Sequence, residues 1–233
     1  MQSTFWKIFL PMALLAFHAG AGTITGTVQA EGKPGANSGM TGGGAYDSRK
    51  FKFVERVNYA DMRDFIVSIE GPVGGKPVVP GTPATVESHH VVQQGAVFTP
   101  HVLPIVVGTT VEWPNNDDIY HNVFSMSDPK PFDLGLYKHG EPGKRVTFDK
   151  PGRVDVFCSI HANMHCIILV LENPYFAATD GSGHYAITNV PPGTYRLKAW
   201  HERLPPQIKE ITVPEDGAVR ADFVLSITNL PTY

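Results

Sequence analysis

The residues best suited to chemistry in this sequence lie in one short stretch, Cys158 to Cys166. Within it, the thiol of Cys158, the imidazole of His161 and the thioether of Met164 follow one another at intervals of three residues. Thiolate and thioether are soft ligands and imidazole is borderline, a combination that suits copper better than other common metals. We therefore expect a copper site, with a fourth ligand from elsewhere in the chain.

The fourth ligand that the sequence favours is His121. It follows an Asn-Asn turn and opens a strand-like segment, so it can face the cysteine stretch across a β-sandwich. Two histidines, one cysteine and a weak axial methionine are the ligands of a type 1, or blue, copper site that transfers electrons. The predicted metal ligands are His121, Cys158, His161 and Met164.

Other uses of the same stretch remain open. A disulfide between Cys158 and Cys166 would close a hairpin, since cysteines pair in exported proteins. Zinc prefers four nitrogen or sulfur ligands and would take Cys158, His161, His165 and Cys166. That arrangement would require all four side chains to turn inward from one short turn, and it would leave His121 idle. Covalent haem is not supported, because the sequence lacks Cys-x-x-Cys-His.

The segments that must position these ligands are short and rich in β-branched residues. The chain has 23 Gly and 20 Pro among 233 residues, and it shows no long helical period. From residue 86 to residue 172, short strand-like runs alternate with turns at Gly108, Pro142-Gly143 and Pro151-Gly152. This spacing predicts an all-β protein in which these residues form a β-sandwich with Greek-key connections.

Residues 86–172 also carry a longer pattern around the ligands. The run from Val107 to Trp113 leads to the Asn-Asn turn and to His121-Asn122-Val123, and Cys-x-x-His-x-x-Met follows. This pattern resembles the cupredoxins, in particular plastocyanin and amicyanin. The resemblance implies a Greek-key sandwich that holds type 1 copper with the four ligands above. It also implies that Asn122 fastens the two ligand loops together.

The sequence departs from the cupredoxin pattern at two places. Ile160 stands where such loops often carry proline before the second histidine. His165 and Cys166 add two potential ligands directly after Met164. The departures leave the copper prediction standing. They also leave open whether Met164 is the only candidate for the axial position.

The rest of the chain predicts a second small β-sandwich. Residues 175–226 resemble the carboxypeptidase regulatory-like, or transthyretin-like, module through the runs 179–185 and 189–195, and residues 25–28 and 65–70 resemble its first strands. The cupredoxin unit would then be inserted in this module or followed by it, as insertions at surface turns are tolerated. The expected regions are a signal peptide at 1–21, N-terminal strands and Gly/Pro-rich segments at 22–85 that pair with the C-terminal sandwich, the cupredoxin domain at 86–172, and the carboxypeptidase regulatory-like sandwich at 173–233.

The first residues predict export. Lys7 precedes the apolar stretch 8–17 and the small residues Ala19-Gly20-Ala21, which is the pattern of a cleavable secretory signal peptide too short to span a bilayer. Loss of Lys7 on cleavage changes the formal net charge from −3 to −4. A mildly acidic chain gives no reason to expect nucleic acid as a partner. We expect a periplasmic protein that does not span the membrane.

The function expected from these features is transport of single electrons rather than catalysis. No Ser-His-Asp arrangement or paired-carboxylate spacing stands out. Chains of this architecture resemble methylamine-utilisation and plastocyanin-like proteins, which implies a protein redox partner such as a dehydrogenase or a cytochrome. The alternative is a non-redox copper-binding protein, such as a chaperone or sensor, or a structural adhesion module. His101 falls in a predicted loop, and the run from Trp200 to Arg203 predicts a strand end with a surface ion pair.

Overall fold

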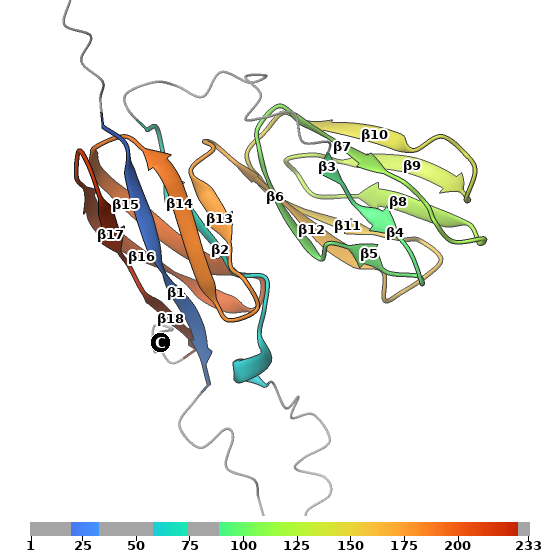
Figure 1. Ribbon diagram of the computed structural model, residues 1–233. Helices are drawn as coiled ribbons and strands as arrows, with labels where there is room; N and C mark the ends of the chain where they lie inside the picture. The colour runs from blue at the N-terminus through green and yellow to red at the C-terminus, as the bar shows by residue number, and fades with distance from the viewer. Residues whose placement is uncertain (1–19, 33–57, 74–88, 228–233) are drawn as a thin grey trace, which may run out of the picture.

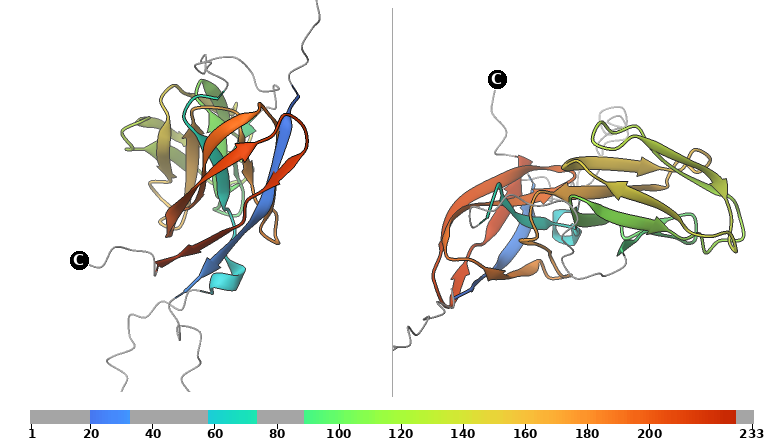
Figure 2. Two further views of the ribbon diagram at one scale, coloured as in Figure 1. Left: turned by 90° about the vertical axis from the view of Figure 1, so that its left-hand side faces the viewer. Right: turned by 90° about the horizontal axis from the view of Figure 1, so that it is seen from above.

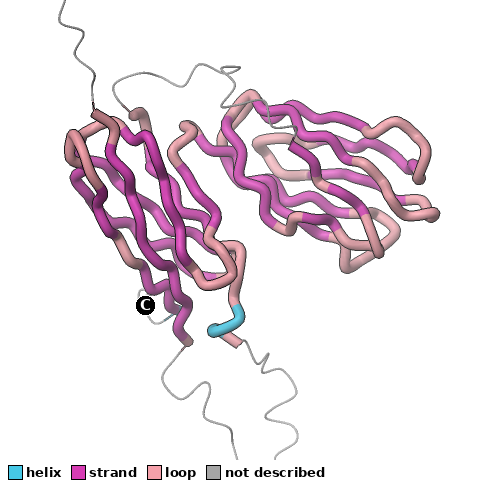
Figure 3. Tube along the Cα trace, viewed as in Figure 1, coloured by secondary structure: helices cyan, strands magenta, loops and turns pink. Residues whose placement is uncertain are grey.

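The computed structural model describes residues 20–32, 58–73 and 89–227, which form two β-sandwiches lying side by side (Figures 1 and 2). Strands dominate the described chain (Figure 3), and its one helical segment is the 3-10 turn η1 (Tyr59–Asp61). The predicted all-β class is confirmed. The signal peptide predicted at 1–21 falls almost entirely outside the described residues. Within the described ranges, no helix is both long and apolar enough to cross a membrane.

The first sandwich contains the predicted ligands. Its larger sheet has five strands in the order β6-β12-β11-β8-β9, and the facing sheet has three in the order β10-β7-β3. A separate pair, β4 with β5, lies beside them. The strands are β3 (His89–His90), β4 (Val92–Gln93), β5 (Phe98–Thr99), β6 (Val102–Val106), β7 (Thr109–Trp113), β8 (His121–Ser125), β9 (Phe132–Tyr137), β10 (Lys144–Phe148), β11 (Gly152–Phe157) and β12 (His165–Leu171).

The two sheets of the first sandwich enclose one apolar core. On β7, Val111 and Trp113 are fully buried, because alternate side chains of a strand point to the same face. Strand β12 is buried on both faces. Its Ile168 packs in this core, whereas Ile167 packs against residues of the second sandwich. The apolar run from Ile167 to Leu171, which directly follows Cys166 in the sequence, is therefore typical of a strand covered on two sides.

The second sandwich is built from strands that precede and follow the first one in sequence. One sheet has the order β14-β1-β17, with β18 also paired to β1, and the other has the order β13-β2-β15-β16. The first sandwich is therefore inserted between β2 and β13. The strands are β1 (Gly22–Glu31), β2 (Ile66–Glu70), β13 (Phe176–Ala178), β14 (His184–Val190), β15 (Gly193–His201), β16 (Leu204–Val213), β17 (Ala218–Arg220) and β18 (Phe223–Ser226).

The two sandwiches meet where β6 and β12 face β2 and β13 (Figure 1). Ile66 of the second sandwich packs with Val102 and Ile167 of the first in a small buried cluster. At the connection into β13, the buried side-chain amide of Asn173 donates to the backbone carbonyls of Ile69 and Gly71 at 2.8 and 2.9 Å. Apolar packing and one anchored connection thus hold the two sandwiches together.

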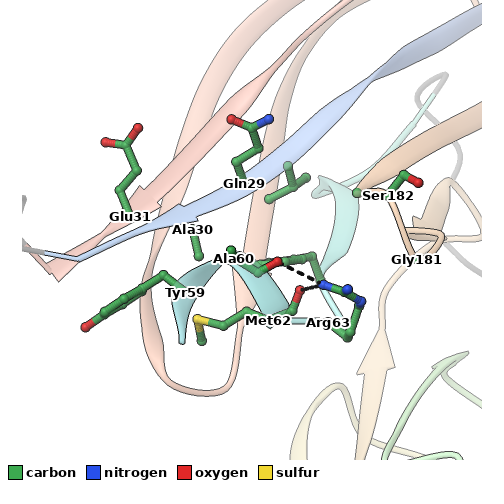
Figure 4. A pocket seen from close by; sticks show the side chains of 12 residues that line it. Gln29, Ala30, Glu31, Tyr59, Ala60, Met62, Arg63, Gly181 and Ser182 are labelled. Carbon is green, nitrogen blue, oxygen red and sulfur yellow. Dashed lines mark hydrogen bonds between the residues drawn. The ribbon is translucent and has the colours of Figure 1, made fainter. Parts of the chain in front are cut away.

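A hollow of about 400 Å³ lies at the edge of the second sandwich, between the end of β1, η1 and the turn 181–183 (Figure 4). Nη1 of Arg63 donates to the carbonyl oxygens of Ala60 and Met62 beside it. No lining residue is a histidine or a cysteine. The hollow is therefore separate from the predicted metal chemistry.

Candidate metal centre

Three of the four predicted ligands come together at one end of the first sandwich. His121 begins β8, Cys158 directly follows β11, and His161 lies in the turn that leads to β12. The Nδ1 atoms of His121 and His161 are 3.0 Å apart, and Sγ of Cys158 is 3.6 Å from Nδ1 of His161. Metal bonds of about 2.0 to 2.3 Å to nitrogen and sulfur place the ligand atoms of one ion roughly 3 to 4 Å apart. Two nitrogens and a sulfur thus converge at the spacing of one metal ion.

Met164 lies at the end of the same loop. Its backbone amide donates to the carbonyl of His161 at 3.0 Å, and its carbonyl accepts from the amide of Cys158 at 3.2 Å. Its side chain is buried in the same core cluster as Cys158. The loop backbone therefore closes a turn around the predicted ligands, and it keeps the thioether on the interior side with the thiol.

Asp117 orients the ring of His121. Nε2 of His121 lies 2.8 Å from Oδ2 of Asp117, while Nδ1 faces His161. A carboxylate only accepts hydrogen bonds, so Nε2 donates and Nδ1 is left with a lone pair for a metal. The backbone amides of Ala96 and Gly95 donate to Asp117 at 2.9 and 2.7 Å. These contacts, with Ala96 first, lower the pKa of Asp117.

Sequence reasoning missed Asp117, although it precedes His121 by only four residues. In the sequence it is one of two consecutive aspartates in a turn, Asp117 and Asp118, and turn aspartates are common without a functional role. Its contact with the histidine depends on how the turn folds back between β7 and β8.

Asn122 joins the two ligand loops, as the cupredoxin resemblance implied, but through its backbone rather than its side chain. The side-chain amide donates to Oδ1 of Asp133 at 2.7 Å and so connects β8 to β9, because that carboxylate lies within reach on the neighbouring strand. The backbone amide of Asn122 instead points at Sγ of Cys158, at 3.4 Å. This N–H is a hydrogen-bond donor to the sulfur ligand. The connection between the two ligand loops is made by the backbone of Asn122.

The structure does not support either alternative use of the cysteine stretch. Cys158 and Cys166 are both free thiols. Cys166 is fully buried in the core, and burial raises the pKa of its thiol. His165 turns to the other face of β12, where its Nε2 lies 2.9 Å from Oδ1 of Asp155. Because neighbouring strand residues point to opposite faces, the four ligands of the zinc alternative do not converge.

The centre is buried but lies close to the surface. His121 is 0% exposed and Cys158 is 5% exposed, whereas His161 is partly exposed. The residues that precede the two histidines, Tyr120 and Ile160, are exposed apolar side chains. Such an arrangement excludes water from the sulfur ligand and brings one imidazole edge to the surface.

Comparison with known proteins identifies one family and several similar structures. Residues 169–226 match the carboxypeptidase regulatory-like domain. No curated protein matches the chain. The copper-containing nitrite reductase of Thermus scotoductus SA-01 is 38% identical, and the match covers 42% of the present chain with a TM-score of 0.35. The chain covers only 26% of that enzyme.

Two smaller copper proteins are also among the similar structures. A purple cupredoxin from Nitrosopumilus maritimus is 26% identical, with 36% of this chain and 99% of that one covered and a TM-score of 0.32. Amicyanin from Paracoccus versutus is 23% identical, with 45% of this chain and 96% of that one covered and a TM-score of 0.33. The two resemblances indicated by the sequence motifs, to cupredoxins and to the carboxypeptidase regulatory-like domain, thus both recur in these comparisons.

Proposed function

We propose that the first sandwich holds type 1 copper through His121, Cys158, His161 and Met164, and that the protein carries single electrons. The observation that supports this most strongly is the convergence of two imidazole Nδ1 atoms and one thiol sulfur within 4.8 Å of one another. Two histidines, a cysteine and a weak axial methionine form the ligand set of electron-transfer copper. Bound copper would supply reversible one-electron chemistry.

The contribution of the protein is to hold these ligands in one arrangement. Asp117 orients one ring, and the backbone amide of Asn122 donates to the sulfur of Cys158. The closed turn between His161 and Met164 connects two paired strands. A site that does not rearrange between two oxidation states suits rapid electron transfer, and buried ligands anchored by strands provide it.

The proposal includes a location and a class of partner. We take the mature chain to be periplasmic after removal of residues 1–21, and we take it to exchange electrons with protein partners such as a dehydrogenase or a cytochrome rather than to convert a substrate. His161 is the most exposed of the three converging ligands, and the exposed side chains of Tyr120 and Ile160 provide apolar surface nearby. Apolar surface of this kind is typical of protein contact sites.

Copper titration of the mature chain tests the proposal. Added Cu(II) should produce intense visible absorption from the thiolate-to-copper transition, and a reductant should bleach it reversibly. The Cys158→Ser variant should stay colourless, whereas Cys166→Ala, which removes the other thiol, should keep the colour. A colourless and redox-silent copper complex of the unmodified protein would contradict electron transport and would favour non-redox copper binding.

A further inference from the structure

A second group of potential ligands lies where the two sandwiches meet. His101 precedes β6 and His165 begins β12, both in the first sandwich, while Glu202 occupies the turn between β15 and β16 of the second. One ligand atom from each of these residues lies within 4.8 Å of the others. None of the three belongs to the proposed copper centre, so this group stands independently of the proposed function.

The ring of His101 lies between two hydrogen-bond acceptors. Its Nδ1 is 3.3 Å from the backbone carbonyl oxygen of His165, and its Nε2 is 3.0 Å from Oε1 of Glu202. A neutral imidazole has a single N–H. It can therefore donate to only one of these two acceptors. When Nδ1–H donates to the carbonyl, the contact between Nε2 and the carboxylate of Glu202 requires a cation, which is either a proton on Nε2 or a metal ion between the two atoms. Metal-bound histidines commonly have this arrangement, with the second nitrogen donating to a backbone carbonyl.

His165 is oriented in a corresponding way by a different acceptor. Its Nε2 lies 2.9 Å from Oδ1 of Asp155, and Arg153 holds that carboxylate through two hydrogen bonds of 2.9 and 2.7 Å. Donation from Nε2 to Asp155 leaves Nδ1 of His165 as the nitrogen with a lone pair. The rings of His101 and His165 meet edge to face, with centroids 5.5 Å apart. His165 therefore has one nitrogen engaged and one with a lone pair, whereas both nitrogens of His101 face acceptors, one of which is Glu202.

The carboxylate of Glu202 completes the group from the opposite sandwich. Nε of Arg203 is 3.9 Å from Oε1 of Glu202 and forms an ion pair with this carboxylate. The side chains of Glu202, His165 and His101 are 19%, 25% and 36% exposed, so an ion can reach them from solvent. The apolar cluster of Ile66, Val102 and Ile167 at the same junction holds the two sandwiches against each other.

We propose that His101, His165 and Glu202 form a second metal site, for a divalent ion of the zinc or copper(II) type. Imidazole and carboxylate without a thiolate suit these ions, and they do not favour copper(I). Two histidines and one glutamate, with a further position left to water, form a known zinc ligand set. Because the ligands come from both sandwiches, an ion bound here connects them.

Zinc titration of a variant that lacks the first centre tests this site. The full mature chain carrying Cys158→Ser and His161→Ala is titrated with Zn²⁺ by calorimetry. We expect one bound ion. Further substitution Glu202→Gln should weaken zinc binding by more than about tenfold, as loss of a ligand has at least the effect of losing its supporting partner. Cu(II) added instead of zinc should give an electron paramagnetic resonance spectrum with coupling to two imidazole nitrogens.

Matched controls separate metal binding from protonation and from unfolding. His184→Gln and Glu210→Gln change an exposed histidine and an exposed glutamate on β14 and β16, and they should leave the zinc affinity unchanged. Circular dichroism confirms that each variant is folded. If Nε2 of His101 holds only a proton, zinc will bind no more tightly to the parent variant than to the Glu202→Gln form, and the proposed site is wrong. Failure of the copper titration above would not affect this result, since the two sites share no ligand.

Discussion

The two groups of ligand-type side chains differ in chemistry, burial and in the parts of the fold that carry them. The group at Cys158 contains sulfur, is largely buried and comes entirely from one sandwich. The group at His101 contains only nitrogen and oxygen, is partly exposed and joins two sandwiches. Soft, buried ligands suit an ion that changes oxidation state away from water, whereas harder ligands at a junction suit an ion that stays divalent. The comparison shows that one small fold can give two groups of ligand-type side chains different environments.

A single change of face between two consecutive residues separates the groups. Met164 is buried in the core beside Cys158, and the next residue, His165, lies on the opposite face near His101. The alternation continues with Cys166 in the core and Ile167 at the junction. The extra potential ligands after Met164, His165 and Cys166, therefore have separate environments because of strand geometry alone.

The largest effects should come from two single substitutions, Cys158→Ser and Glu202→Gln, each of which removes a ligand from one group only. Cys158→Ser should abolish the visible copper absorption entirely and leave zinc binding at His101 intact. Glu202→Gln should weaken zinc binding at His101 and leave the visible copper absorption intact. Absorption spectroscopy and zinc calorimetry on both variants measure this. If either substitution impairs both properties in a protein that circular dichroism shows to be folded, the two groups are not independent.

Ile167→Ala should be the most destabilising of the single changes. Its side chain is fully buried at the junction, and replacing a buried isoleucine by alanine costs about 2 to 5 kcal/mol in the free energy of unfolding. The zinc affinity at Glu202 should fall with it, because the two sandwiches would be held less firmly. Urea denaturation measures the free energy, with Val224→Ala on the exposed face of β18 as a control. Unchanged zinc affinity would show that the junction does not position Glu202.

Asp117→Asn should weaken copper binding without removing the colour. An asparagine can turn its amide toward Nε2 of His121, so the ring loses the acceptor that orients it. Loss of such a supporting partner lowers metal affinity about 10- to 100-fold. Competition with a copper chelator measures the change. The neighbouring exposed Asp118→Asn is the control, and an equal loss in both variants would contradict a specific role for Asp117.

The smallest effect should be an acid-dependent one in the second sandwich. Hydrogen bonding from Arg220, followed by contacts with Thr27, lowers the pKa of Asp222 to about 2, compared with an ordinary value of about 3.9. A depressed carboxyl pKa stabilises the fold above the ordinary value, and this contribution is lost as the pH falls from about 4 to about 2. Asp222→Asn should therefore lower the melting temperature slightly at neutral pH and flatten its decline between pH 4 and pH 2.

Thermal melts over this pH range measure the Asp222 effect. Asp216→Asn, in the exposed turn before β17, is the control. Copper absorption at neutral pH should be the same in both variants, since Asp222 contacts β1 and Arg220 rather than either ligand group. A decline as steep in Asp222→Asn as in the unmodified protein would show that another carboxyl group dominates.

Local features of the metal centre were predictable from sequence because they depend on spacing. The Cys-x-x-His-x-x-Met run places its residues in one turn, and the flanking β-branched runs form β11 and β12. Residues 25–28 and 65–70, which resemble the first strands of the second sandwich, similarly indicated β1 and β2. These predictions needed only the alternation of side chains and the chemistry of the ligands.

Features that depend on long-range contacts were not predictable in this way. The pairing of His89 and His90 with β7 to form β3 has no periodic signal in the sequence, because two residues are too few to show one. The run from Trp200 to Arg203 was predicted to carry only a surface ion pair, yet Glu202 meets His101 across the junction, 101 residues away in sequence. No periodicity carries such information, because the packing of two separately folded sheets brings these side chains together.

The insertion of one sandwich into the other also sets the order in which the two can be completed during synthesis. Strand β1 pairs with β18, whose residues Phe223–Ser226 emerge long after the first sandwich ends at Leu171. When the chain is available from its N-terminal end up to Leu171, the first sandwich has all of its strands, whereas β1 and β2 still lack their partners among β13 to β18. The copper-type site can therefore assemble before the sandwich that surrounds it in sequence is closed, and the junction ligand Glu202 joins His101 and His165 only afterwards.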